Sequence, residues 1–197
     1  RTPLTTISGY AELLSSGMLQ KPEDATEFGR KILAESRRLL TLIEDIIRLS
    51  RLDEGVRGEV TPVDLTALIQ HCVQKLTPAA QNAQVSISAS GNDPVLISGD
   101  HALLEEMLTN LLENGIKYNH AGGYVRARAE MADGRAVVTV ADNGVGIAPE
   151  DQQRVFERFY RVDKSRSKQT GGTGLGLAIV KHGAQVHHAQ IAMQSAL

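Results

Sequence analysis

The segment Gly-Gly-Thr-Gly-Leu-Gly-Leu at residues 171–177 decides the fold of this chain, because two related motifs precede it. Asp-Asn-Gly-Val-Gly-Ile stands at residues 142–147, and Asn-Leu-Leu-Glu-Asn-Gly-Ile-Lys-Tyr stands at residues 110–118. A single glycine pattern occurs often by chance. Three motifs in this order, with two asparagines four residues apart on a predicted helix, are far more specific. Together they predict a nucleotide pocket.

Each motif has a physical reason to be in such a pocket. Gly174 and Gly176 stand where a helix is predicted to begin, so backbone N–H groups and the helix N-terminus can face phosphates. Asn110 and Asn114 share one helix face and can offer amide oxygens to a hard cation. Asp142, at the end of a predicted strand, is an acceptor suited to an exocyclic amine. The alternative is a set of glycine-rich turns in an ordinary α/β domain.

Bulk properties exclude several classes of protein. The 197 residues have a net charge of −2, which does not indicate nucleic acid or an anionic membrane as a main partner. The single cysteine, Cys72, allows no disulfide framework and suits a reducing cytosol. No apolar run reaches the length of a membrane span, and no signal peptide is visible. Because the sequence begins inside a predicted helix, we expect it to be a piece of a longer protein.

Residues 1–53 are predicted to form two helices joined by a connector at residues 17–24. The second helix has an apolar seam at steps of three and four and a second apolar stripe beside it. The seam is Ala25, Phe28, Ile32, Leu39, Leu42, Ile46 and Leu49, and the stripe is Leu33, Leu40, Ile43 and Ile47. One hairpin cannot cover both, so we expect a homodimeric four-helix bundle. The alternative is that the second stripe packs on the neighbouring domain.

Residues 55–62 are predicted to be a linker, and residues 63–197 an α/β domain. Helices are expected after the caps Asp64 and Asp100 and at residues 175–187. Strands are expected at residues 85–89, 95–97, 124–131, 135–141 and 190–194, with a hairpin turn at Asp133-Gly134. This pattern predicts a two-layer α/β sandwich. Residues 146–168 lack strong periodicity and are charged, so they are expected to form a mobile lid.

These motifs resemble those of the sensor histidine kinases of two-component signalling, and the likeness covers nearly the whole chain. Residues 110–118 are similar to the N box, 142–147 and 172–177 to the two glycine boxes, and 156–160 to the F box. Residues 1–5, Arg-Thr-Pro-Leu-Thr, are similar to the end of the H box. The resemblance implies a phosphotransfer hairpin at residues 1–54, followed by an ATP-binding domain of the Bergerat type. It places the phospho-accepting histidine three residues before Arg1, outside this sequence.

The resemblance also implies roles for single residues. Asp142 would hydrogen-bond the adenine amine, and Asn114 would hold Mg²⁺ with assistance from Asn110. Lys117 would contact phosphate, and Tyr118 would lie at the edge of the nucleotide. The other expected nucleotide contacts are Gly144, Gly146, Ile147, Phe159, Gly172, Thr173, Gly174, Leu175, Gly176 and Leu177.

Further residues are expected to act on the phosphoryl group. Arg158 and Arg161, with Lys164 and Arg166, would supply positive charge to a phosphate in transit, although any one of them could be a solvated loop charge. Thr2 matches the position, four after the histidine, where the family has a polar residue that orients water for dephosphorylating a partner.

The sequence departs from the family pattern in three ways. Gly115 replaces the usual alanine, at a cost of about 0.5–1 kcal/mol in helix propensity. His188 and Ala189 replace a Gly-Gly pair, so the last helix lacks a C-cap glycine. The sequence also ends before the family's closing glycine-rich segment and terminal strand, so the sheet is expected to lack an edge strand. None of the six histidines has the context of a phosphoacceptor, and all are expected on the surface or in turns.

The implied function is ATP-dependent autophosphorylation on the upstream histidine and phosphotransfer to an aspartate of a response-regulator receiver domain, with phosphatase activity toward that regulator. The implied location is a cytoplasmic domain of a protein anchored in the bacterial inner membrane by segments absent from this sequence. One alternative is an ATPase of the gyrase, chaperone or mismatch-repair branches, which lack the Thr-Pro-Leu hairpin. Another is a non-catalytic module that binds nucleotide and dimerises. Residue types do not decide whether phosphorylation runs within or between subunits.

Overall fold

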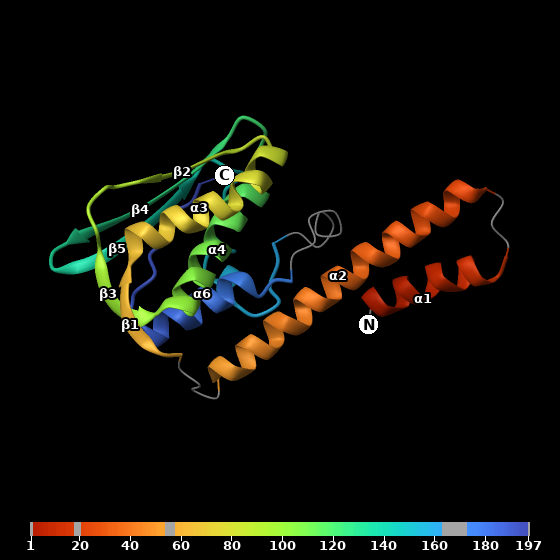
Figure 1. Ribbon diagram of the computed structural model, residues 1–197, viewed down its shortest axis with the longest axis horizontal. Helices are drawn as coiled ribbons and strands as arrows, with labels where there is room; N and C mark the ends of the chain where they lie inside the picture. Colours follow the sequence, from red (N-terminus) through yellow and green to blue (C-terminus); the bar gives the residue numbers. More distant parts are fainter. Residues whose placement is uncertain (1, 18–20, 54–57, 163–172, 197) are drawn as a thin grey trace.

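A helical hairpin projects from an α/β domain in the computed structural model, which describes residues 2–17, 21–53, 58–162 and 173–196 (Figure 1). The hairpin consists of α1 (Thr2–Ser15) and α2 (Pro22–Asp53). Tyr10 of α1 packs against Phe28 of α2 with ring centroids 5.2 Å apart. The two predicted helices are therefore confirmed, and α2 begins at a proline, whose missing N–H is not needed in a first helical turn.

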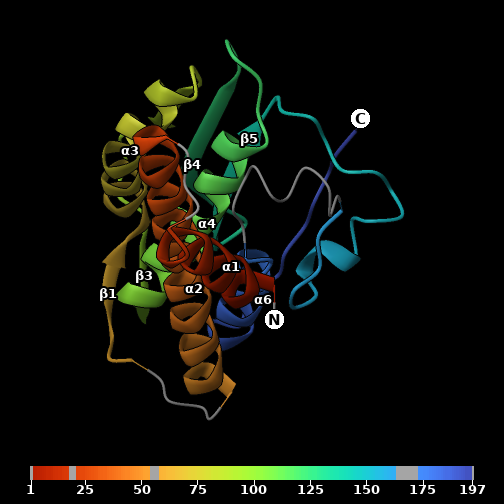
Figure 2. The same cartoon turned by 90° about the vertical axis from the view of Figure 1, so that its right-hand side faces the viewer.

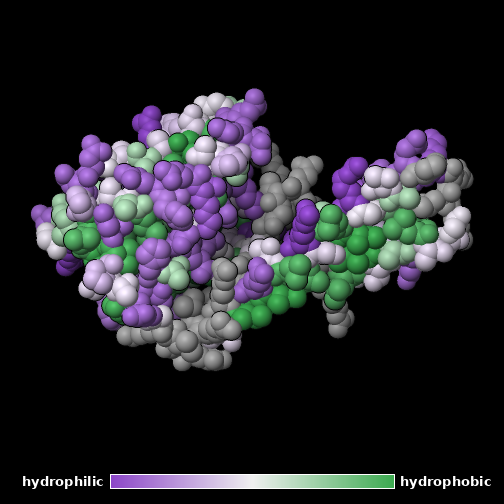
Figure 3. Space-filling model, in the orientation of Figure 1, coloured by the Kyte–Doolittle hydropathy of each residue, from purple (hydrophilic) through white to green (hydrophobic). Residues whose placement is uncertain are grey.

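The two apolar stripes predicted on α2 have different surroundings. Leu42, from the first stripe, packs against Leu175 and Ile179 of the α/β domain. The second stripe is open to solvent, with exposed fractions of 49%, 59%, 45% and 48% at Leu33, Leu40, Ile43 and Ile47. Figure 3 shows hydrophobic atoms following the hairpin. The alternative in which this stripe packs on the neighbouring domain is therefore wrong, and the side chain of Leu49 lies outside the described residues.

The α/β domain begins with a strand where a linker was expected. β1 (Val60–Asp64) pairs antiparallel with β3 (Leu96–Asp100), so the last residues of the segment 55–62 belong to a sheet. Pro62 is compatible with this strand because the described part of the chain gives β1 only β3 as a neighbour, and an edge strand tolerates a missing donor.

The larger sheet contains β2 (Ser86–Ser90), β4 (Tyr124–Ala132) and β5 (Arg135–Asp142) in the order β2-β4-β5. β2 runs parallel to β4, and β5 runs antiparallel to it. The predicted turn between β4 and β5 is confirmed, with positive φ angles of 50° at Asp133 and 74° at Gly134.

The strand predicted at residues 190–194 does not form. Two residues after the last helix, His188 has a φ of 53°, in the left-handed conformation that glycine usually adopts. The chain then runs to the loop after β5, where Ser195 Oγ accepts a hydrogen bond from Ile147 N at 2.9 Å and Ser195 O accepts one from Gln152 Nε2 at 3.0 Å. These bonds hold the end of the chain beside that loop, as Figure 2 shows.

A layer of three helices, two of which pack directly on the strands, lies on one side of the sheet and confirms the two-layer sandwich. The helices are α3 (Leu65–Asn82), α4 (His101–Lys117) and α6 (Gly176–Val186), with α4 packed against both others. On β4, Val125, Ala127 and Ala129 are buried under the helices, whereas Arg126 and Arg128 are exposed on the opposite face. This alternation is the pattern of a strand with one covered face.

Both predicted helix caps are present. Asp64 Oδ1 accepts hydrogen bonds from Thr66 N at 2.9 Å and Ala67 N at 3.4 Å, and Asp100 Oδ1 accepts one from Leu103 N at 3.1 Å. Cys72 of α3 is a buried free thiol, as expected, and burial raises its pKa.

His187 has a structural role that the sequence did not indicate. Its ring Nε2 accepts a hydrogen bond from Asp100 N at 3.0 Å, and its Nδ1 donates to Gly183 O at 2.8 Å. The ring is half-buried and joins the end of α6 to the start of α4.

Candidate nucleotide-binding site

The asparagines of α4 lie beside the glycine that begins α6. Asn110 and Asn114 are both half-buried. Asn110 Nδ2 donates to Glu106 O at 3.0 Å, and a Cβ built at Gly176 would lie 2.5 Å from Asn110 Oδ1. A larger residue at 176 would require the Asn110 side chain to move, so the structure brings the N box and the second glycine box close together at the N-terminus of a helix.

The first glycine box is joined to the end of α4. Gly144 N donates to Asp142 Oδ1 at 2.9 Å, and Val145 N donates to Tyr118 O at 3.0 Å. A Cβ at Gly144 would lie 2.5 Å from Tyr118 O. The exposed carboxylate of Asp142 is therefore held at the end of β5, next to the backbone of Tyr118.

Two asparagines that the sequence analysis did not single out connect the end of α4 with the start of β4 and the loop after β5. Asn119 Nδ2 donates to Gly115 O at 3.1 Å and to Tyr124 O at 3.0 Å. Asn143 Oδ1 accepts from Tyr124 N at 2.6 Å. Both bind the first residue of β4 and so align the end of α4 with the loop after β5. The sequence could have indicated this role, because both asparagines lie in or directly beside the motifs at residues 110–118 and 142–147, and asparagine side chains commonly bind the backbone of loops.

Gly115 allows α4 to lie close to the sheet. A Cβ at this residue would lie 3.0 and 3.1 Å from the methyl carbons of Val125 and 3.6 Å from Asp142 Cβ. The departure from the family's alanine therefore falls at a tight contact beneath the candidate adenine site.

The predicted phosphate contact, Lys117, is half-buried among cations. Burial lowers its pKa most; Arg161 lowers it further, and Arg38 of α2 does so to a smaller extent, whereas Glu113 opposes them. Its Nζ also lies 5.2 Å from the centre of the Tyr118 ring. An ammonium group held in this environment is suited to an anionic ligand, which would compensate both the burial and the repulsion.

The lid residues are placed only in part. Arg158 is exposed and Arg161 is half-buried, whereas Lys164, Arg166 and Gly172 lie outside the described residues. The side chain of Thr2 also lies outside them. The proposed mobility of residues 146–168 remains a prediction; within this segment η1 (Arg154–Phe156) forms one short helix.

The aromatic residues of the F box do not all anchor this segment. The side chain of Phe159, an expected nucleotide contact, is 56% exposed, and its φ is 63°. Its backbone is bound instead, because Phe159 N donates to Gly174 O at 2.9 Å. Tyr160 is held by its hydroxyl, which donates to Asp151 and has a raised pKa for that reason, and by Arg154 4.3 Å above its ring.

The remaining predicted contacts surround the start of α6 and the first glycine box. Thr173 Oγ1 accepts from Leu175 N at 3.3 Å, and Leu175 is fully buried while Leu177 is half-buried. Gly146 has a φ of 71°, which favours glycine. Ile147 is half-buried and bonded to Ser195.

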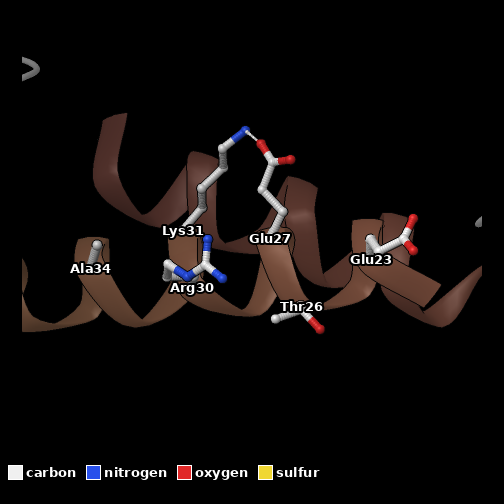
Figure 4. Close-up of a pocket in the computed structure, with 6 residues that line it drawn as sticks. All are labelled: Glu23, Thr26, Glu27, Arg30, Lys31 and Ala34. Atoms are coloured by element: carbon white, nitrogen blue, oxygen red, sulfur yellow. Dashed lines mark ion pairs between the residues drawn. The ribbon is translucent and has the colours of Figure 1, made fainter. Parts of the chain in front are cut away.

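A shallow groove on the hairpin is separate from these motifs. Figure 4 shows its lining, which consists of Glu23, Thr26, Glu27, Arg30, Lys31 and Ala34. Glu27 and Lys31 form an ion pair at 2.6 Å. This half of α2 points away from the α/β domain in Figure 1, so the groove is no part of the nucleotide site.

The fold and the site define an ATP-binding protein with an attached helical hairpin, and comparison with known families agrees. Residues 99–197 match the histidine kinase-, DNA gyrase B- and HSP90-like ATPases, and residues 1–55 match the His Kinase A (phospho-acceptor) domain. The chain belongs to the sensor histidine kinase family.

Several relatives share both parts. The chain is 40% identical over 196 residues to the sensor-like histidine kinase SenX3 of Mycolicibacterium smegmatis, covering 99% of this chain and 51% of the relative. It is 37% identical over 203 residues to the phosphate regulon sensor protein PhoR of Pseudomonas aeruginosa, covering 99% and 44%. The chain thus spans about half the length of the curated relatives it matches.

Solved structures give the same result. Full-length ShkA in complex with AMPPNP superimposes with a TM-score of 0.70 at 31% identity, covering 94% of this chain and 38% of that one. The Acinetobacter baumannii histidine kinase AdeS gives a TM-score of 0.74 at 25% identity, covering 94% and 85%. None of the helices in the described part of the chain is long and apolar enough to span a membrane.

Proposed function

We propose that this chain is the catalytic core of a sensor histidine kinase that binds ATP with Mg²⁺. The core phosphorylates a histidine upstream of Arg1, and the phosphoryl group then passes to an aspartate of a response regulator. The observation that supports this most is the convergence of the N box and both glycine boxes around α4, where Asn110 meets Gly176 and Tyr118 meets Gly144.

The residues at the end of β5 and along α4 have separate roles. Asp142 accepts a hydrogen bond from the adenine amine, and Lys117 binds phosphate. Asn114 and Asn110 offer amide oxygens on one face of the helix, where a hard cation would share its other ligand positions with phosphate oxygens and water. Bound Mg²⁺ would neutralise the charge that develops on the phosphates during transfer.

A calorimetric titration with ADP in the presence of Mg²⁺ tests nucleotide binding. The variant Asp142→Asn should lose affinity by about tenfold or more, because an amide N–H would face the adenine donor. Asp133→Asn is the matched control: it makes the same change in the turn at the other end of β5, and asparagine tolerates its positive φ. Equal affinities for the wild type and Asp142→Asn would remove Asp142 from the adenine site.

The core functions as a homodimer through residues 1–53. The exposed stripe on α2 supports this, since a second hairpin would bury Leu33, Leu40, Ile43 and Ile47. Light scattering should give twice the chain mass, and Leu40→Asp with Ile43→Asp should yield the monomer. Thr41→Asp, at an exposed residue on another face of α2, should leave the dimer intact. A wild-type chain that is monomeric at micromolar concentration would contradict the bundle.

The finer assignments also belong to this proposal. The parent protein is anchored in the bacterial inner membrane, with this core on the cytoplasmic side. Thr2 supports dephosphorylation of the regulator. In a chain extended to include the histidine, Thr2→Ala should lose phosphatase activity and retain autophosphorylation. No autophosphorylation by the extended wild type would favour a nucleotide-binding docking module instead.

A further inference from the structure

Arg38 lies on the side of α2 that faces the α/β domain. Leu42, one helical turn further along α2, packs against Leu175 and Ile179 at the start of α6. Residues four apart share a helix face, so Arg38 points toward the same domain. Figure 1 shows α2 passing beside α6. The Arg38 side chain is 30% exposed, whereas its neighbour Arg37 lies on the exposed side of the helix.

An ion pair within α2 orients this guanidinium group. Arg38 Nη1 donates to Glu35 Oε1 at 3.2 Å, and the Glu35 side chain is only 20% exposed. A guanidinium has five N–H donors in a planar fork, so one bond to Glu35 leaves donors for a second anion.

Arg38 lies within electrostatic range of Lys117, the expected phosphate contact. Lys117 comes from the end of α4 and Arg161 from the segment after η1, and Arg38 adds a third positive charge from the hairpin. All three are half-buried, and both arginines lower the pKa of Lys117. Glu113 acts on Lys117 in the opposite sense, and Glu35 pairs with Arg38. An anion bound beside Lys117 would lower the cost of holding positive charge in these partly buried positions.

We propose that Arg38 completes the phosphate site and binds the terminal phosphate of ATP across the interface between the hairpin and the α/β domain. This inference rests on the proposed ATP-binding function. Adenine is expected at Asp142, at the end of β5, whereas α2 contacts the domain at the N-terminus of α6, the expected phosphate end. The terminal phosphate is therefore the part of the nucleotide nearest the hairpin. Bound ATP, and not ADP, would then fix the two parts of the chain against each other.

Calorimetry with ADP and with a non-hydrolysable ATP analogue, both with Mg²⁺, tests the role of Arg38. Arg38→Ala should weaken binding of the triphosphate by about tenfold, the loss of one charge-assisted hydrogen-bonding partner, and change binding of ADP by about twofold or less. Arg37→Ala, the adjacent and exposed arginine, should change neither. Arg38→Lys should give an intermediate loss, because it keeps the charge and loses the planar fork.

The outcomes separate the two proposals. If the wild type binds neither nucleotide, the ATP-binding function fails and the role of Arg38 fails with it. If the wild type binds both, then unchanged triphosphate binding in Arg38→Ala, or an equal loss for both nucleotides, overturns the role of Arg38 alone. Should Arg38→Ala fail to fold, as judged by circular dichroism, the comparison of Arg38→Lys with Arg37→Lys decides by the same criterion.

Discussion

Gly144→Ala should destabilise the α/β domain and weaken nucleotide binding at the same time. A Cβ at this residue would lie 2.5 Å from Tyr118 O and 2.9 Å from Asp142 Oδ1. Real Cβ atoms essentially never approach a heavy atom within 3.0 Å, and Tyr118 O is a backbone atom that no side-chain rotation can move away. The loop after β5 must therefore separate from the end of α4.

The magnitude follows from the bonds that this separation breaks. They are the hydrogen bond from Val145 N to Tyr118 O at 3.0 Å and that from Gly144 N to Asp142 Oδ1 at 2.9 Å. At about 0.5–1.5 kcal/mol each, their loss costs about 1–3 kcal/mol. Alanine restricts the unfolded chain and returns about 0.4–1 kcal/mol of this. The expected net loss is about 1–2 kcal/mol.

Urea unfolding followed by circular dichroism measures the stability, and calorimetry with ADP measures the affinity. Affinity should fall by about tenfold or more, because Asp142 moves with the loop. Gly29→Ala is the control: no heavy atom lies within 4 Å of its Cβ position on α2, so alanine should stabilise the helix by about 1 kcal/mol. Wild-type stability and affinity in Gly144→Ala would refute the view that this close approach positions Asp142.

Three further predictions test the site and its support. In a chain extended to include the histidine, Asn114→Ala should abolish metal-dependent autophosphorylation while ADP affinity falls less, and wild-type rates would exclude Asn114 as a metal ligand. Asp64→Ala should cost about 2–4 kcal/mol in urea unfolding against about 1 kcal/mol for Asp100→Ala. Asp64 Oδ1 also accepts from the buried Val95 N at 3.2 Å, whereas the additional partner of Asp100, Gly58 N at 3.1 Å, is exposed, so equal losses would contradict this reasoning. Lys117→Met should raise the melting temperature measured without nucleotide. The pKa of Lys117 is lowered in the folded state, so its positive charge destabilises the fold at neutral pH, below that pKa. A lower melting temperature in Lys117→Met would contradict this reasoning.

The sequence alone determined the features that depend on neighbouring residues. Asp64 and Asp100 cap helices because their side chains reach backbone N–H groups two or three residues ahead. Asp133 and Gly134 form the turn between β4 and β5 because they adopt positive φ. The order of the three glycine- and asparagine-containing motifs identified the family for the same reason, since each motif is local and is read without knowledge of the fold.

Only the tertiary structure decided which distant groups meet. Pro62 lies in a strand because β3 pairs with it, whereas residues 190–194 form no strand, and Ser195 after them binds Ile147 and Gln152. Asn119 precedes β4 in the sequence and Asn143 follows β5, yet both side chains bind the backbone of Tyr124. The bond between Asp100 N and His187 joins groups 87 residues apart. Such contacts depend on how helices pack on the sheet, and a periodic pattern specifies which face is buried without specifying its partner.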